Sequence, residues 1–179
     1  MSRLKNFQPS YSDIPGMIPV TLRELEQKGL ARINDDSREI EFIISPKWPY
    51  RNESRIGDAS ISRLFECIRE MHWERDIITI TGETPIDCTT IASFEEFKRP
   101  VTAGEKVIGR YKVLYVGNTS YRLELSLTSP SGSQLCSSEK TFAFFDSIHQ
   151  KAISPPDAVR RNLEILRVRD TKVPQCQDQ

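Results

Sequence analysis

The stretch that decides the fold is residues 59–75, ASISRLFECIREMHWER. Apolar side chains recur in it at spacings of three and four, which predicts one apolar stripe along a helix: Ile61, Leu64, Phe65, Ile68 and Met71. Asp58 and Ser60 are both candidate N-caps, and neither Gly nor Pro interrupts the segment. We therefore predict one long helix of roughly 25 Å, at about 1.5 Å per residue.

On both sides of this helix the apolar residues alternate, a pattern typical of half-buried strands. The segments expected to be strands are 39–45, 76–83, 87–101, 106–116, 120–128 and 134–145. A short helix is expected over 20–28 and a second one over 157–167, after Pro155 and Pro156. One long helix with a run of antiparallel strands predicts an α+β domain in which the helix packs against one curved sheet.

The chain has 179 residues, which fits one domain with additions at its ends. We divide it into an N-terminal arm with a short helix (1–38), the main domain (39–153) and a C-terminal helix with a tail (154–179). One sheet cannot cover both sides of the long helix. We therefore expect a homodimer or a higher homo-oligomer.

Composition and motifs argue against several classes of function. The 25 Lys and Arg residues balance the 25 Asp and Glu residues, so no net field attracts nucleic acid or an acidic membrane. The two histidines and four cysteines have no zinc-ligand spacing, and the absence of a secretory signal favours reduced thiols in the cytoplasm. No Gly-rich phosphate loop or Gly-x-Ser-x-Gly elbow occurs. We expect chemistry without metal, nucleotide or a serine triad.

Two segments carry a resemblance to a known family. Residues 56–73 (IGDASISRLFECIREMHW) and 97–145, which begin FKRPVTAGEKV, resemble the central helix and the sheet of hotdog-fold thioesterases of the 4-hydroxybenzoyl-CoA thioesterase type. The resemblance spans about 39–153. It implies a single hotdog domain that hydrolyses acyl-CoA or acyl-carrier-protein thioesters without a cofactor. It also implies a site at the dimer interface, near the start of the central helix.

The resemblance further implies which residues act. In one branch, backbone N–H groups at the helix start bind the oxyanion, and a helical carboxylate two turns later is the base or nucleophile. Those positions are Gly57, Asp58 and Ala59, then Glu66. Asp58 departs from the family, which usually has an uncharged residue there, and a capping carboxylate would occupy the same N–H groups. Glu66 could instead be a solvated helix residue that pairs with a neighbouring arginine.

A second branch has an Asp in the loop before the helix, where Asn52 is the nearest match in this chain. Some hotdog thioesterases lack the carboxylate and use a loop Asn with a helix Arg, which would be Asn52 and Arg69 here. Each has a simpler explanation, a turn for Asn52 and an ion pair with Glu66 or Glu70 for Arg69. Hotdog dehydratases need a His 14 residues before the helical acid, where this chain has Asn52, so dehydration is disfavoured.

Other residues have a structural or a peripheral interpretation. Lys98 and Arg99 could contact CoA phosphates or lie at a solvated strand end. We expect Cys67 to be a buried thiol and His72 a packed or surface histidine. The expected aromatic core is Tyr111, Tyr115, Phe142 and Phe144. Two alternatives to hydrolysis stay open, a hotdog module that binds an acyl chain or a partner without turnover, and acyl transfer in a biosynthetic pathway.

Overall fold

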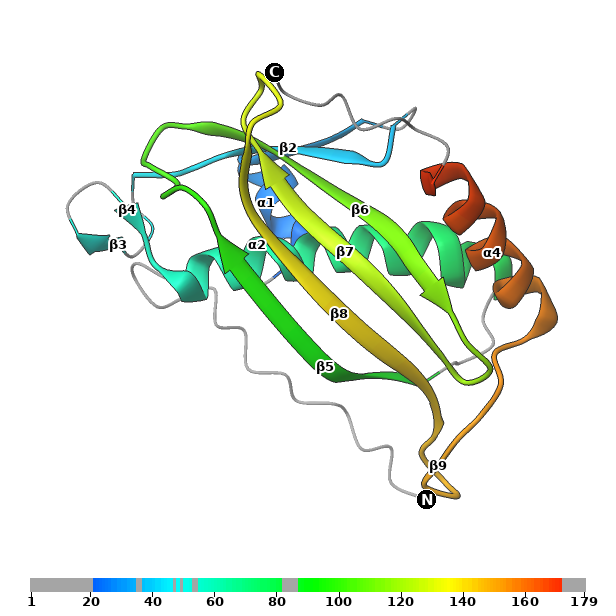
Figure 1. Cartoon of the computed structure of the whole chain (residues 1–179). Helices are drawn as coiled ribbons and strands as arrows, with labels where there is room; N and C mark the ends of the chain where they lie inside the picture. Colours follow the sequence, from blue (N-terminus) through cyan, green and yellow to red (C-terminus); the bar gives the residue numbers. More distant parts are fainter. Residues whose placement is uncertain are drawn as a thin grey trace.

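The computed structural model describes residues 21–34, 37–46, 48, 50–52, 55–81 and 87–171. Helix α2 (Asp58–His72) crosses the concave face of a strongly curved antiparallel sheet, which wraps around it (Figure 1). This is the α+β hotdog arrangement predicted from the sequence. None of the helices in the described part of the chain is long and apolar enough to cross a membrane.

The sheet has the order β1-β2-β6-β7-β8-β5, and all its pairings are antiparallel. The strands in this order are β1 (Ala31–Asn34), β2 (Glu39–Ile43), β5 (Asp87–Phe97), β6 (Lys106–Val116), β7 (Ser120–Thr128) and β8 (Gln134–Asp146), and the short β9 (Lys151–Ala152) also pairs with β8. The remaining elements are α1 (Leu22–Gln27), β3 (Tyr50–Asn52), β4 (Arg55–Ile56) and α4 (Asp157–Thr171). The predicted strands 106–116 and 120–128 are confirmed to the residue, whereas β5 ends four residues before the expected 101.

The core lies between α2 and the concave face of the sheet. The whole predicted stripe of α2 is buried. The helix comes so close to β6 that a Cβ at Gly109 would lie 2.7 Å from the Phe42 side chain and 2.8 Å from that of Ile68. Gly109 therefore fixes how closely the helix approaches the sheet.

The predicted strand over 76–83 is wrong. The helix continues as a π-helix, η2 (Trp73–Ile78), and then as α3 (Thr79–Thr81). Alternating β-branched residues suggested a strand, but tertiary contacts decide the conformation here. Ile77 is buried, and the Asp76 carboxylate accepts a hydrogen bond from the Tyr111 hydroxyl at 2.5 Å. Residues 82 and 83 lie outside the described part of the chain.

Two smaller predictions are also corrected. The N-cap of α2 is Gly57, and Asp58 is the first helical residue. Tyr115 is 51% exposed rather than part of the aromatic core, because the β6–β7 register shifts between Val113 and Tyr115 and the extra residue turns its side chain outward. The core positions of Tyr111, Phe142 and Phe144 are confirmed.

The two sides of the sheet end differently. Only residues 106–110 of β6 pair with β2, and α4 packs against β6. Beyond the β2 pairing, the Asp170 carboxylate of α4 accepts a hydrogen bond from the Val113 backbone N–H at 3.0 Å. On the other side, β5 forms an edge of the sheet (Figure 1). It has 11 residues, and three of its apolar side chains are exposed: Ile91, Phe94 and Phe97. No other strand in the described part of the chain pairs with the outer side of β5. An edge strand of this length that stays unpaired is unusual for a monomeric protein.

Candidate functional site

The start of α2 has a glycine, Gly57, as its N-cap. Gly57 is extended (φ −73°, ψ 161°), and its carbonyl accepts from the N–H groups of Ser60 and Ile61 at 2.9 and 3.2 Å. Because Gly57 has no side chain, the N-cap residue itself makes no capping hydrogen bond. The first amides of a helix have no intrahelical acceptor and lie at the positive end of its dipole, so this end suits a developing negative charge.

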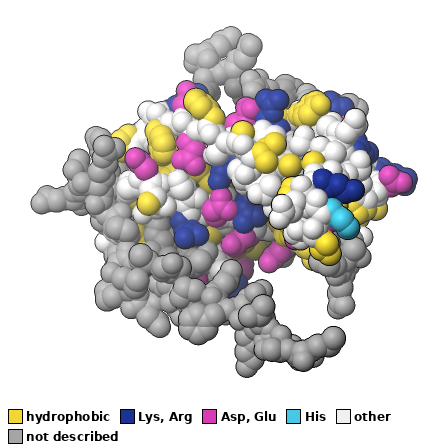
Figure 2. Space-filling model, turned by 90° about the horizontal axis from the view of Figure 1, so that it is seen from below, with side chains coloured by type: hydrophobic (Ala, Val, Ile, Leu, Met, Phe, Trp, Pro, Cys, Tyr) yellow, Lys and Arg dark blue, Asp and Glu magenta, His cyan; other side chains and the backbone are white. Residues whose placement is uncertain are grey.

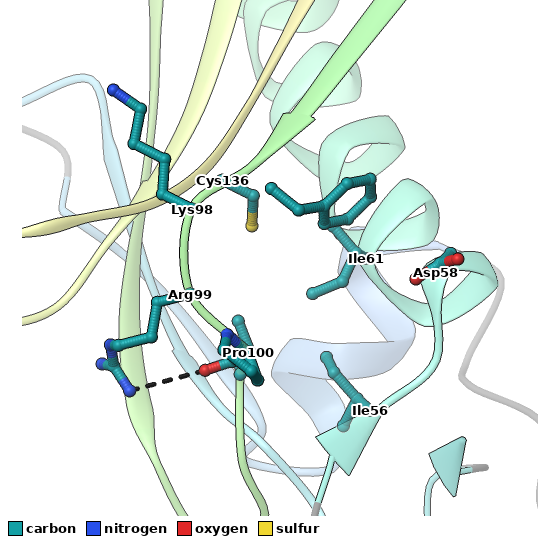
Figure 3. Close-up of a pocket in the computed structure, with 9 residues that line it drawn as sticks. Ile56, Asp58, Ile61, Lys98, Arg99, Pro100 and Cys136 are labelled. Atoms are coloured by element: carbon teal, nitrogen blue, oxygen red, sulfur yellow. Dashed lines mark hydrogen bonds between the residues drawn. The ribbon is translucent and has the colours of Figure 1, made fainter. Parts of the chain in front are cut away.

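A pocket of about 330 Å³ lies beside this helix start. Figure 3 shows Ile56 and Ile61 on one side of it and Cys136 on another, with the Cys136 sulfur directed into the space. The side chains of Lys98 and Arg99 leave the pocket wall and point outward. Three residues proposed from the sequence, Asp58, Lys98 and Arg99, thus line one apolar pocket with cations at its rim.

The turn after β5 holds these cations. Arg99 pairs with Glu105 at 2.5 Å, and Glu105 also accepts from the Thr102 N–H at 3.0 Å, which fixes the turn. Gly104 allows the turn with φ 76° and donates its N–H to the Ile44 carbonyl at 2.8 Å. Lys98 makes a longer contact with Glu96 at 3.9 Å. Arg99 therefore has a structural role in the turn, and Lys98 is the less restrained cation at the rim.

Glu66 lies farther along α2 and is held by two cations. Its Oε1 is 2.5 Å from the Lys140 Nζ and its Oε2 is 2.6 Å from the Arg69 Nε. Burial raises the pKa of Glu66, but hydrogen bonds and charges from Lys140 and Arg69 outweigh burial and hold the pKa below its usual value. Glu66 is therefore an ionised carboxylate with both oxygens bound.

The structure separates the proposed residues into two groups. Asp58, Lys98 and Arg99 surround the pocket, while Glu66 and Arg69 contact one another beside β8. Eight residues separate Asp58 from Glu66, which is about 12 Å along a helix. The backbone of Asn52 lies in β3, and its side chain falls outside the described residues.

Lys140 was missed by the sequence analysis, although a signal for it exists. Strand β8 alternates, and Lys140 falls on the same face as Cys136, Phe142 and Phe144. A charged residue in an apolar series predicts a buried partner, although the sequence does not show which of the acidic residues it is. Figure 2 shows the molecule from below, and acidic and basic side chains lie close together in the middle of the surface seen in this view.

The thiols and His72 do not resemble reactive groups. Burial raises the pKa of Cys67 and of Cys136 to about 12, so both are protonated at neutral pH, and the expected burial of Cys67 is confirmed. His72 is fully buried, with its Nδ1 2.9 Å from an Asp76 carboxylate oxygen. Because the ring also packs against Tyr111, the interpretation of His72 as a packed histidine is confirmed.

Comparison with solved structures agrees with this fold at low identity. A hypothetical protein of Staphylococcus aureus, solved in complex with CoA, has a TM-score of 0.64 and 10% identity over 79% of this chain and 88% of its own. A predicted thioesterase of Bacillus stearothermophilus has a TM-score of 0.60 and 15% identity over 72% of this chain and 96% of its own. A Thermus thermophilus thioesterase complexed with coenzyme A and zinc has a TM-score of 0.57 and 14% identity over 75% of this chain and 98% of its own.

No curated protein sequence matches the chain significantly. The family model of the Thioesterase-like superfamily matches residues 56–163, which is more than half of the chain. The match begins just before α2 and ends within α4, so it includes the helix start, Glu66 and every strand from β5 onward. The chain therefore belongs to the Thioesterase-like superfamily.

Proposed function

We propose that this protein hydrolyses an acyl thioester, of CoA or of an acyl carrier protein, by attack of water on the thioester carbonyl. The observation that carries the proposal is the start of α2, with Gly57 as its N-cap, beside an apolar pocket with cations at its rim. Membership of the Thioesterase-like superfamily and the CoA complexes of two structural neighbours support it.

The helix start stabilises the negative charge that develops on the carbonyl oxygen. Backbone N–H groups of Asp58 and Ala59 bind the carbonyl oxygen as it becomes negative, and Gly57 leaves room in front of them. Such preorganised donors are worth about a hundredfold to a thousandfold in kcat each. Lys98 at the rim suits a phosphate of CoA or of a carrier protein's prosthetic arm.

Glu66 supplies the base or nucleophile in this proposal, but in one protomer it lies too far from the helix start. The rise of about 12 Å exceeds the reach of a carboxylate to a carbonyl bound at the same helix start. The proposal therefore places a second copy along the β5 edge, with the Glu66 of that copy serving the pocket of the first. The exposed Ile91, Phe94 and Phe97 of this edge support a homodimer with the site at its interface.

Two variants test the chemistry separately. Asp58→Pro removes one backbone N–H at the first helical position, which tolerates proline, and should lower kcat by about a hundredfold while the protein stays folded. Glu66→Gln should lower kcat by about a hundredfold or more across a panel of acyl-CoA and acyl-carrier-protein substrates. Full activity in both variants would refute this assignment and turn attention to Asn52 with Arg69.

Mixing the two variants tests the interface. If the helix start of one protomer works with Glu66 of its partner, each mixed dimer contains one intact site of two. Random mixing then restores about a quarter of the wild-type activity. Mixed pools that stay inactive, although sedimentation shows dimers that exchange subunits, would place the whole site within one protomer.

A second candidate is acyl binding without turnover. Both oxygens of Glu66 are already bound to cations, which leaves fewer lone pairs for water. Tight binding of a non-hydrolysable acyl-CoA analogue, with no hydrolysis on the whole panel, would favour this candidate. Acyl transfer would be recognised by product formation with an added amine or alcohol.

A further inference from the structure

Lys140 on β8 is a charged residue inside the core. Its side chain is only 8% exposed, and it lies on the concave face among Cys136, Ser138 and Phe142. Burying a lysine is costly unless the ammonium group finds a charged partner. The position therefore calls for a specific partner, and the structure supplies one.

The partner is Glu66 on α2, and its contact with the Lys140 ammonium group at 2.5 Å joins the central helix to the sheet. Arg69 binds the other oxygen of the same carboxylate, but from the same helix and with a side chain 31% exposed. Arg69 therefore moves with Glu66, whereas Lys140 ties the carboxylate to a different element. Only the lysine fixes where the carboxylate lies relative to the sheet.

Other charged groups also face this contact. On α2, the charges of Arg63 and Glu70 act on the neighbouring Cys67, and Glu70 and Glu66 act on one another. On β5, Glu95 accepts a hydrogen bond at 3.2 Å from the hydroxyl of Ser62, which lies one turn before Glu66. The negative charge of Glu70 favours protonation of Glu66, and Lys140 and Arg69 oppose it. Removing Lys140 would leave Glu66 with one cation and the like charge of Glu70.

We propose that Lys140 is a positioning residue, which orients the Glu66 carboxylate from the sheet and keeps it ionised for the hydrolysis proposed above. Lys140 touches no reacting atom in this scheme and acts through Glu66. The inference rests on the proposed function only for its catalytic consequence. The link between Lys140 and the titration of Glu66 can be measured without turnover.

The experiment compares Lys140→Met and Lys140→Arg with the wild type and with Lys112→Met. Lys112 is the matched control, because it is also a strand lysine paired with a glutamate, Glu124, at 3.8 Å, but it is exposed. The two readouts are the pH dependence of kcat and KM, and a carbon-13 NMR titration of the glutamate carboxylates. Glu66→Gln identifies the Glu66 resonance.

We expect Lys140→Met to lower kcat by about tenfold to a hundredfold, the cost of a misplaced catalytic group, with little change in KM. The acid limb of its kcat profile and the NMR midpoint of Glu66 should both move to higher pH. Lys140→Arg should recover most of the loss, and Lys112→Met should behave as the wild type. If Lys140→Met does not fold, Lys140→Gln takes its place.

Two results would overturn the inference. One is an NMR midpoint of Glu66 that Lys140→Met leaves unchanged, and the other is a raised KM at constant kcat, which indicates direct substrate contact. If the wild type hydrolyses none of the substrates, the proposed function fails by itself. The NMR midpoint then decides the coupling of Lys140 to Glu66 alone.

Discussion

Two carboxylates, Glu66 in the middle of α2 and Asp76 in its π-helical continuation η2, each bind two polar partners, yet they differ in their surroundings. Glu66 contacts Lys140 of β8 and Arg69 and is 30% exposed. Asp76 contacts the fully buried His72 and the Tyr111 hydroxyl, and the side chain of Asn162 on α4 donates to its backbone carbonyl at 3.0 Å. The pKa of both carboxylates is lowered. A perturbed pKa therefore does not distinguish a reactive group from a structural one, and access to solvent and substrate must be considered as well.

The largest expected effect separates these two clusters by stability. Asp76→Ala leaves His72 and Tyr111 without their shared partner in the core and should cost about 4 kcal/mol of unfolding free energy. Glu66→Ala should cost about half as much, because its cluster is partly open to water. Chemical denaturation of both variants measures the difference. Equal losses of unfolding free energy would show that the Glu66 cluster contributes as much to stability as the Asp76 cluster.

A substitution between the clusters should disturb both. Gly109→Val places a side chain where a Cβ would already lie 2.8 Å from Ile68, a residue between Glu66 and His72 on α2. The helix must move away from β6, at a cost of about 2 to 3 kcal/mol. Thermal unfolding and the NMR signals of Glu66 and His72 would report the movement. Undisturbed signals of both residues would mean that the helix absorbs the added volume locally.

The pH dependence of stability should contain opposing contributions. Lowered folded-state pKa values make Asp76 and Glu66 stabilising above their unfolded pKa values of about 3.9 and 4.3, and this contribution is lost as pH falls through the folded values. Burial raises the pKa of Glu70, so its contribution is present at low pH and lost as pH rises. A tenfold difference between the folded and unfolded acid dissociation constants of one group corresponds to about 1.4 kcal/mol of unfolding free energy.

Denaturation between about pH 3 and pH 7 would measure these contributions. Asp76→Asn and Glu66→Gln should flatten the loss of stability on the acid side, and Glu70→Gln should steepen it. The Asp76 variant should change the curve most, because its cluster is the more buried. The same acid-side slope in Glu66→Gln and the wild type would contradict the ion contacts of Glu66.

Sequence periodicity predicts most of the fold, because an element that turns one face to the core repeats its apolar residues with the period of that element. The stripe from Ile61 to Met71 and the alternation of β6 and β7 each reflect one face turned to the core. The same reasoning failed for 76–83, where contacts of Asp76 with His72 and Tyr111 override β propensity. These contacts join residues up to 35 positions apart, which periodicity does not detect.

The candidate site was predictable only in part. The resemblance to hotdog thioesterases proposed Gly57, Asp58, Ala59 and Glu66 as site residues, and the structure places Gly57 at the N-cap of α2 with the other three within the helix. The resemblance could not reveal that Lys140, 74 residues later, binds Glu66. Nor could it show that Lys98 and Arg99 line a pocket with Asp58, since this depends on the path of the turn after β5.

The smallest expected effect concerns an ion pair outside both clusters. Lys112 and Glu124 face each other across β6 and β7 at 3.8 Å, with 42% and 34% of their side chains exposed. Water screens such a pair, so Lys112→Met should change the unfolding free energy by at most about 0.5 kcal/mol. The change should shrink further in high salt. Denaturation of this variant at low and high ionic strength sets the baseline for the two α2 clusters, because all three sites pair a carboxylate with a cation or a donor. A loss at Lys112 as large as that of Glu66→Ala would mean that burial of Lys140 adds nothing to its contact with Glu66.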